Sequence, residues 1–243
     1  NPTERVCLLM AEIEEGEQFR VGKLGVSGDE TADVDALHEK LELKEGEVFN
    51  RSFLTRDVES LTHHYTDRGY YLAAVTPGTD LSESEKKVDV DFQVERGALH
   101  FVREIEVAGN TTTIDPVIRR ELQMVEGQLW SARAIDVSKR RLDGLGYFEE
   151  VSFEPKPTDQ PGELDLNVRV VEKPTGSISF GAGFSSQDSF VLSGSIAQSN
   201  LFGRGYGVSL SADIGGSTDR FFFSFSDSYL FGSSIGFGGT MFL

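Results

Sequence analysis

Cysteine is nearly absent from this 243-residue sequence: Cys7 is the only one, so no internal disulfide can form. No run of 18 apolar residues occurs, which excludes a transmembrane helix. Positive charge is scarce, and a net charge of −17 argues against a nucleic-acid-binding protein, which needs a basic face. A signal-peptide pattern is missing and the sequence begins at Asn1, so we expect a piece of a longer protein.

Residues with metal-ligand spacing are also lacking. His63 and His64 are adjacent on an expected helix and face different directions, so they do not form the i, i+4 pair that binds a metal. Asp33 and Asp35 lack the glycine and the distal glutamate of a calcium loop, and we interpret them as a helix start. We therefore expect no cofactor and no metal.

Charge is distributed unevenly along the chain. Residues 176–243 contain no lysine, 2 arginines and 4 acidic residues, whereas residues 1–175 contain 36 acidic and 21 basic residues. The same C-terminal segment holds 13 of the 26 glycines and 13 of the 25 aromatic residues. The two parts of the chain are therefore expected to face different solvents.

The N-terminal part contains an internal repeat. Two segments recur at a displacement of 81 residues and a third at 77, which places a loss of four residues in the helix between them. The pairs are VSGDE at 26–30 with VAGNT at 107–111, EGEVF at 45–49 with EGQLW at 126–130, and DRGYY at 67–71 with GLGYF at 144–148. The boundaries that follow are a last strand of a preceding copy at 1–17, and complete copies at 18–97 and 98–174.

Each copy is predicted to run strand, helix, helix, strand, strand. Val34, Leu37 and Leu41 form a helical stripe in the first copy, and a second stripe follows. Strands are expected at 71–75 and at 88–94, the latter with strict alternation. In the second copy, Asp115 and Pro116 are expected to open the first helix as cap and first helical residue. Such a unit is an α+β module with two helices on one sheet face.

Residues 175–243 change to a period of two. Five segments of about 9–11 residues alternate apolar residues with glycine and serine, and turns are expected at 199–205 and 229–234. A soluble β-sandwich half is the alternative, but a face of glycine and serine suits a water-filled lumen better than a soluble surface. We therefore predict the opening strands of a membrane β-barrel, whose remaining strands lie beyond Leu243 because an open edge in lipid leaves backbone groups unpaired.

Acidic tandem β-α-α-β-β repeats that lead directly into such strands resemble the Omp85 superfamily, in which the repeats are called POTRA domains. The resemblance covers residues 18–243 and is carried by VAGNTTT with RRELQMVEGQLW (107–130), RRLDGLGYFEEV (140–151), VVEKPTGSISFGAGFS (170–185) and SNLFGRGYGVSLS (199–211). It implies the last two POTRA domains and the first five strands of a barrel of about sixteen. The family's lumen-inserted loop motif lies in later barrel sequence.

The resemblance implies an outer-membrane location in a diderm bacterium, with POTRA domains in the periplasm. It implies a role in folding and inserting β-barrel proteins, with unfolded outer-membrane proteins as clients, the lipid bilayer as surroundings and accessory periplasmic lipoproteins as partners. POTRA sheets are expected to accept clients by β-augmentation. In the family the first barrel strand closes the barrel as a lateral gate. The gate residues here are Ser177, Ile178, Ser179, Phe180, Gly181, Ala182, Gly183 and Phe184.

Two features of these candidate sites have alternative interpretations. Gly181 and Gly183 weaken strand pairing in the gate interpretation, whereas lumen clearance or sheet curvature explains them equally well. The family's last POTRA domain docks an accessory lipoprotein, and a short run of three residues in the second repeat is the candidate docking site. The two arginines of this run also fit an ordinary helix surface. That run is Arg119, Arg120 and Glu121.

Related functions remain as alternatives. A translocation-assembly protein or a two-partner secretion exporter differs in the number of upstream POTRA domains. The barrel could also anchor an upstream patatin-like lipase, which a G-x-S-x-G nucleophile motif before the repeats would support. For the chain itself we expect no enzymatic activity, because client insertion is a problem of hydrogen bonding rather than covalent chemistry.

Overall fold

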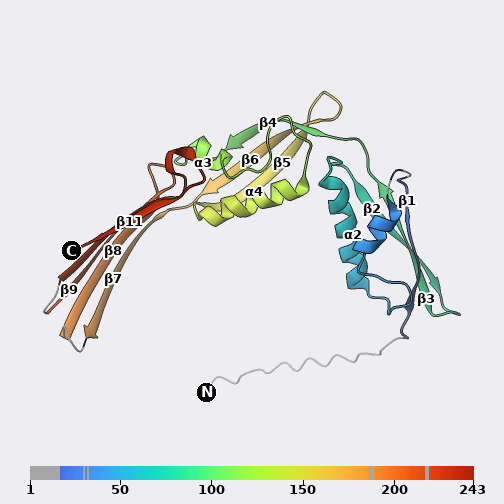
Figure 1. The fold of residues 1–243 in the computed structure, drawn as a ribbon, viewed down its shortest axis with the longest axis horizontal. Helices are drawn as coiled ribbons and strands as arrows, with labels where there is room; N and C mark the ends of the chain where they lie inside the picture. The colour runs from blue at the N-terminus through green and yellow to red at the C-terminus, as the bar shows by residue number, and fades with distance from the viewer. Residues whose placement is uncertain (1–16, 30, 32, 186–188, 217–218) are drawn as a thin grey trace, which may run out of the picture. The chain divides into compact units, whose positions relative to one another are not determined.

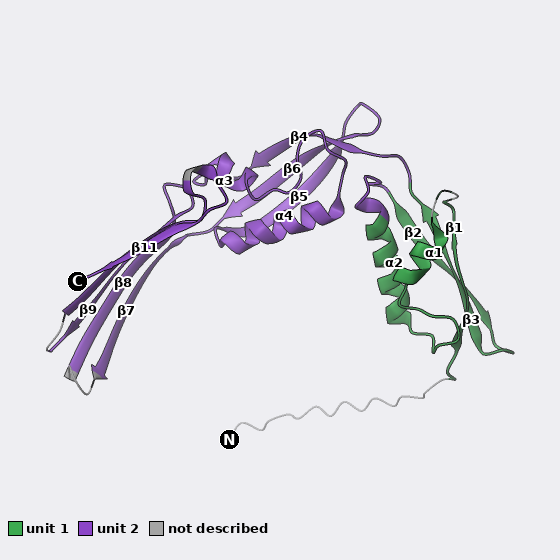
Figure 2. Cartoon of the chain, in the orientation of Figure 1, with its two compact units in different colours: residues 1–64, 73–96 green, residues 65–72, 97–243 purple. Residues whose placement is uncertain are grey.

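The structure is a computed structural model that describes residues 17–29, 31, 33–185, 189–216 and 219–243. The described chain forms two compact units, one of residues 17–64 and 73–96 and the other of residues 65–72 and 97–243 (Figure 2). The predicted last strand of a preceding repeat, at 1–17, lies outside the described residues except for Glu17.

The first repeat has the predicted order of elements (Figure 1). Its strands and helices are β1 (Arg20–Ser27), α1 (Val34–Lys40), α2 (Arg51–Thr66), β2 (Ala74–Ser82) and β3 (Lys87–Glu95). The sheet has the order β1-β3-β2, with β1 parallel and β2 antiparallel to β3. Val90 and Phe92 of β3 are buried with Leu37 and Leu61 of the helices, whereas Asp89 and Asp91 alternate with them on the open face. The strict alternation predicted for this strand is confirmed.

The second repeat has the same topology. It consists of β4 (Phe101–Ala108), α3 (Asp115–Arg119), α4 (Ala132–Leu145), β5 (Phe148–Pro157) and β6 (Glu163–Glu172), with the sheet order β4-β6-β5. Helix α4 packs along one face of the sheet (Figure 1). Its Leu142 is fully buried against Leu164, Leu166 and Val168 of β6. No helix among the described residues is long and apolar enough to cross a membrane.

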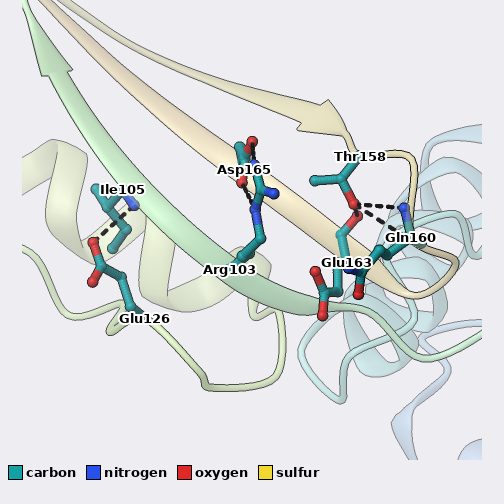
Figure 3. A network of polar contacts seen from close by, with 7 residues as sticks. All are labelled: Arg103, Ile105, Glu126, Thr158, Gln160, Glu163 and Asp165. Carbon is teal, nitrogen blue, oxygen red and sulfur yellow. Dashed lines mark hydrogen bonds and ion pairs between the residues drawn. The ribbon is translucent and has the colours of Figure 1, made fainter.

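The two repeats share hydrogen bonds as well as topology. The Leu24 amide donates to the Glu45 carboxylate in the first repeat, and the Ile105 amide donates to Glu126 in the second at the same displacement of 81 (Figure 3). Asp57 of α2 accepts from the Glu42 amide, and Ser138 of α4 takes the equivalent place by accepting from the Gln123 amide, again at a displacement of 81. The repeat seen in the sequence is therefore a repeat of local interactions.

Polar contacts occupy the open face of the second sheet. Arg103 of β4 donates to Asp165 of β6 at 2.8 Å, and Thr158, Gln160 and Glu163 form a small network in the turn between β5 and β6 (Figure 3). Neither Arg103 nor Asp165 is buried, so this ion pair makes a small contribution to stability.

Three local predictions were wrong in detail. The residue that caps α3 is Ile114 rather than Asp115, and Asp115 instead pairs with Arg119 one turn later. The strand expected at 71–75 begins at Ala74 and runs to Ser82. The four residues lost between the repeats come only partly from the helix: α2 has 16 residues and α4 has 14, and the other two are Asp67 and Arg68, which separate α2 from Gly69.

The C-terminal segment forms a five-stranded antiparallel sheet in the order β7-β8-β9-β10-β11 (Figure 1). The strands are β7 (Gly176–Ser185), β8 (Ser189–Leu201), β9 (Tyr206–Gly215), β10 (Asp219–Asp227) and β11 (Phe237–Phe242), and a 3-10 helix, η1 (Leu230–Gly232), precedes β11. The predicted number of strands and both predicted turns are confirmed.

The strand registers align the two alternating patterns across the whole sheet. One row of directly opposite residues is Ile178, Ile196, Leu210, Phe223 and Met241, and the adjacent row is Ser177, Ala197, Ser209, Ser224 and Thr240. Because successive side chains point to opposite faces, the first row lies on an apolar face and the second on a small-residue face. The alternation of the sequence therefore describes the two faces of one sheet.

Candidate functional site

Strand β7 forms an edge of the five-stranded sheet. Within the described residues its one neighbour is β8, so its other side presents unpaired backbone N–H and C=O groups. Its apolar side chains are strongly exposed: Phe180 is 87% and Phe184 88% accessible. All eight residues predicted for the gate lie on this strand.

The two glycines of β7 differ in their surroundings. A Cβ added to Gly181 would lie 2.7 Å from the Ser193 hydroxyl of β8, whereas nothing lies within 4 Å of a Cβ added to Gly183. An added side chain at Gly181 would therefore require the Ser193 hydroxyl to rotate away, whereas at Gly183 it would meet open space. Whether either glycine weakens the pairing of a gate stays a prediction.

The base of this sheet is joined to the second repeat by a set of contacts that we call the junction. It consists of the loop 110–114 after β4, residue Glu172 at the end of β6 and the turn 200–205 between β8 and β9. The side-chain amide nitrogen of Asn200 donates to the Thr113 hydroxyl at 2.8 Å. The side-chain carbonyl oxygen of Asn200 accepts from the backbone amide of Gly205, also at 2.8 Å. The Ile114 amide donates to the Gly203 carbonyl at 3.0 Å. Asn200 and Thr113 are both buried, so these bonds are shielded from water.

The Glu172 carboxylate holds the loop 110–114 in place. It accepts hydrogen bonds from the Thr111 amide and hydroxyl, from the Thr112 amide and from the Thr113 amide, at 2.6–3.0 Å. Desolvation opposes ionisation, but these hydrogen bonds outweigh it and lower the pKa of Glu172 to about 2. The carboxylate is thus the ionised centre of a loop that itself supports the sheet.

Gly203 permits the close approach at the junction. Its φ is +69°, and a side chain there would collide with the Thr112 carbonyl. We expect Gly203→Ala to reduce the free energy of unfolding of the second repeat by about 2 kcal/mol more than Gly127→Ala. Gly127 is a matched control because its φ is +82° and nothing lies within 4 Å of an added Cβ.

The measurement is denaturation of the chain in detergent micelles, followed by the fluorescence of Trp130, which is the single tryptophan and is buried in the second repeat. Equal losses in the two glycine variants would contradict the role given to the close approach.

The three residues predicted to dock a partner lie in different surroundings. Arg119 is exposed, donates to the Asp115 carboxylate at 2.7 Å and donates to the Ile105 carbonyl at 2.8 Å. The Arg120 guanidinium lies 4.0 Å from the centre of the Tyr229 ring, and Glu121 is 4% accessible. Partner docking stays a prediction for all three, but Arg119 alone presents an exposed side chain.

Tyr229 connects this run to the five-stranded sheet. Burial raises the pKa of its hydroxyl above the ordinary range, and a hydrogen bond to Glu121 raises it further. The Arg120 guanidinium that contacts the Tyr229 ring also approaches Gly205, because a Cβ added to Gly205 would lie 2.7 Å from it. Arg120, in the second half of the predicted docking run, thus approaches the junction at Gly205.

One pentapeptide, Gly232 to Gly236, has the spacing G-x-S-x-G. It connects η1 to β11, so it lacks the turn from a strand into a helix on which a nucleophile of that type depends. The spacing alone gives no reason to assign a nucleophile.

Sequence reasoning missed Glu172, Asn200 and Gly203 as a connected set. Glu172 was visible as the acid that recurs at the end of each repeat, since Glu95 precedes it by 77 residues. Asn200 and Gly203 were visible only as turn residues. Nothing local indicates that this turn contacts a loop that lies almost ninety residues earlier in the chain.

Comparisons with known proteins agree with this architecture. The family model for POTRA, described as surface antigen variable number repeat, matches residues 19–97 and 100–173. The chain is 30% identical over 235 residues to the outer membrane protein assembly factor BamA of Nitratidesulfovibrio vulgaris, covering 95% of this chain and 30% of that protein. It is 32% identical over 228 residues to the protein of the same name from Neisseria meningitidis serogroup B, covering 93% and 29%.

A solved structure matches as well. The crystal structure of BamA from Haemophilus ducreyi lacking POTRA domains 1–3 superposes with a TM-score of 0.82 at 28% identity, covering 92% of this chain and 42% of that one. Tandem POTRA repeats followed by an antiparallel sheet thus define the class, and the chain belongs to the POTRA family. The two relatives and the solved structure named above are BamA proteins matched over 92% or more of this chain, which confirms the predicted resemblance. The chain spans 30% and 29% of the two relatives.

Proposed function

We propose that this chain is part of an assembly factor that folds and inserts β-barrel proteins into the outer membrane. The observation that carries the proposal is the combination of two POTRA repeats with a sheet that has one apolar and one small-residue face, in a chain similar to proteins named outer membrane protein assembly factor. In this proposal the apolar face contacts lipid, the small-residue face lines a lumen and the POTRA repeats lie in the periplasm.

The lateral gate is proposed at the free edge of β7. A client strand that enters lipid alone exposes each backbone N–H and C=O at a cost of several kcal/mol. An edge with unpaired groups offers partners to that strand before it leaves water. The assignment is supported by the place of β7 as the strand that directly follows the second repeat, which is the place of the gate strand in the family that the chain resembles.

Capture by β-augmentation is proposed at a POTRA edge. In each repeat the edge strand that runs parallel to the central strand, β1 or β4, is partly covered by an isolated β-bridge. These bridges pair Arg20 with Val48 and Phe101 with Leu129. Among the described strands, β2 and β5 are therefore the open edges. β5 contains Pro155 and Pro157 two residues apart, which removes two donors from the same side of the strand. β2 contains Pro77 alone, so it is the better edge for a client.

The partners proposed are unfolded outer-membrane proteins, an accessory periplasmic lipoprotein and the lipid bilayer. Arg119 is the candidate contact for the lipoprotein because its side chain is exposed on the second repeat. We propose no enzymatic activity and no cofactor, because pairing and insertion of strands require hydrogen-bond partners rather than covalent chemistry.

Depletion of the full-length protein in its own cell tests the proposed function. We expect other outer-membrane β-barrel proteins to disappear from the membrane fraction while soluble periplasmic proteins persist, and re-expression to restore them. Quantitative proteomics of outer-membrane fractions is the measurement. Unchanged levels of barrel proteins after depletion would rule the function out.

A further inference from the structure

A cavity of about 500 Å³ lies beside the junction, at the base of the five-stranded sheet. It is formed by residues of the second repeat, of the turn after β8 and of the segment between β10 and β11. Its apolar lining includes Ile114, Val117, Tyr206, Phe225 and Leu230. Phe225 is directly opposite Val208 and two residues from Phe223, so the cavity continues the apolar face of the sheet.

Two opposite charges line the cavity without pairing with each other. Arg204 is exposed, and within the described part of the chain its side chain has no ion-pair partner or hydrogen bond. Asp227 is 6% accessible and accepts a hydrogen bond from the Tyr229 amide at 2.9 Å. The charge of Arg120, which also lines the cavity, is partly balanced by Glu121, whose carboxylate oxygen lies 3.8 Å from it.

Two aromatic rings lie beside the buried acid. Tyr206 is directly opposite Asp227 in the sheet, and its ring lies 5.8 Å from that of Phe225, whereas the Tyr229 ring already contacts the guanidinium of Arg120. Aromatic faces beside a carboxylate attract an ammonium group, whereas an unpaired arginine binds a phosphate. The cavity therefore offers both halves of a zwitterion a partner, next to a surface for acyl chains.

We propose that this cavity binds the headgroup of an amine-bearing phospholipid, with its phosphate on Arg204 and its ammonium at Asp227 and the adjacent rings. The proposal rests on the proposed function, because it requires the apolar face to contact a bilayer. Binding there holds a lipid at the base of the sheet, where the second repeat meets the membrane surface.

The test is native mass spectrometry of the full-length protein in detergent, with phosphatidylethanolamine or phosphatidylglycerol of identical acyl chains. We expect phosphatidylethanolamine to be retained about tenfold better, because its ammonium group makes a charge-assisted hydrogen bond with Asp227 that a neutral glycerol headgroup does not make. Arg204→Gln is expected to reduce its retention about tenfold, and the matched control Arg169→Gln, on the exposed open face of the second sheet, to leave it unchanged. Asp227→Asn keeps the acceptor for Tyr229 and is expected to remove the preference for the amine.

Three results would overturn the proposal. They are equal retention of the two lipids by the wild-type protein, equal retention of phosphatidylethanolamine by the two arginine variants, and displacement of the lipid by inorganic phosphate as readily as by glycerophosphoethanolamine. Client insertion is measured on the same preparations. A protein that inserts clients but shows no such lipid retention refutes the cavity assignment alone, whereas a protein that inserts no clients counts against the proposed function.

Discussion

A disulfide that joins β7 to the terminal barrel strand of the full-length protein is expected to abolish client insertion while leaving the fold intact. The lock occupies the backbone groups of the β7 edge, so an entering strand finds no hydrogen-bond partners and bears the full cost of its unpaired groups in lipid. Insertion of a radiolabelled client into proteoliposomes is the measurement. Addition of a reductant is expected to restore the wild-type rate.

The control places a disulfide within the sheet instead of across the gate. Ser179 and Ser195 are directly opposite on β7 and β8, at a separation between Cα atoms of about 4.5–5.5 Å that a disulfide can span. Ser179→Cys with Ser195→Cys therefore joins two strands that are already paired and is expected to preserve insertion. Cys7 and any further native cysteine of the full-length protein are replaced by serine in both proteins so that one pair of thiols is present. Insertion at the normal rate with the gate locked would refute the gate.

Glu172→Gln is expected to lower the free energy of unfolding of the second repeat by about 3 kcal/mol at neutral pH. The pKa of Glu172 falls from 4.5 to about 2 on folding, and each unit of such a shift is worth about 1.4 kcal/mol. The glutamine has one acceptor oxygen for four donors and carries no charge. Glu106→Gln, on an exposed glutamate of the same repeat, is the matched control and is expected to change stability by less than about 0.5 kcal/mol.

The same carboxylate gives stability a defined dependence on pH. Because its pKa is lower in the folded state, the stabilisation is complete above pH 4.5 and is lost as the pH falls towards 2. Between pH 4.5 and 2, the free energy of unfolding of the wild-type protein is therefore expected to fall by about 3 kcal/mol more than that of Glu172→Gln. Denaturation followed by Trp130 fluorescence from pH 7 to 2 measures both curves. Parallel curves would show that Glu172 is not the ionised centre of the loop.

Regular elements were predictable wherever a periodic pattern determined them. Val88, Val90, Phe92 and Val94 alternate with acidic and polar residues, and β3 buries every one of the four. Alternation likewise predicted the apolar row that contains Ile178 and Phe223. Element ends were less predictable, because the cap of α3 and the first residue of β2 depend on how the chain enters and leaves the sheet.

The order of elements and the two faces of the C-terminal sheet could be predicted from the amino-acid sequence, because each follows from side chains a few residues apart. The tandem repeat could be predicted because similar segments recur at a nearly fixed displacement. The fold in three dimensions was needed to find the junction, in which Glu172 bonds to Thr111 across 61 residues and Asn200 to Thr113 across 87. The fold was also needed to find that Arg204 and Asp227 line one cavity without pairing with each other. Such contacts depend on how distant segments meet in space, and a hydrogen bond between them leaves no periodic pattern along the chain.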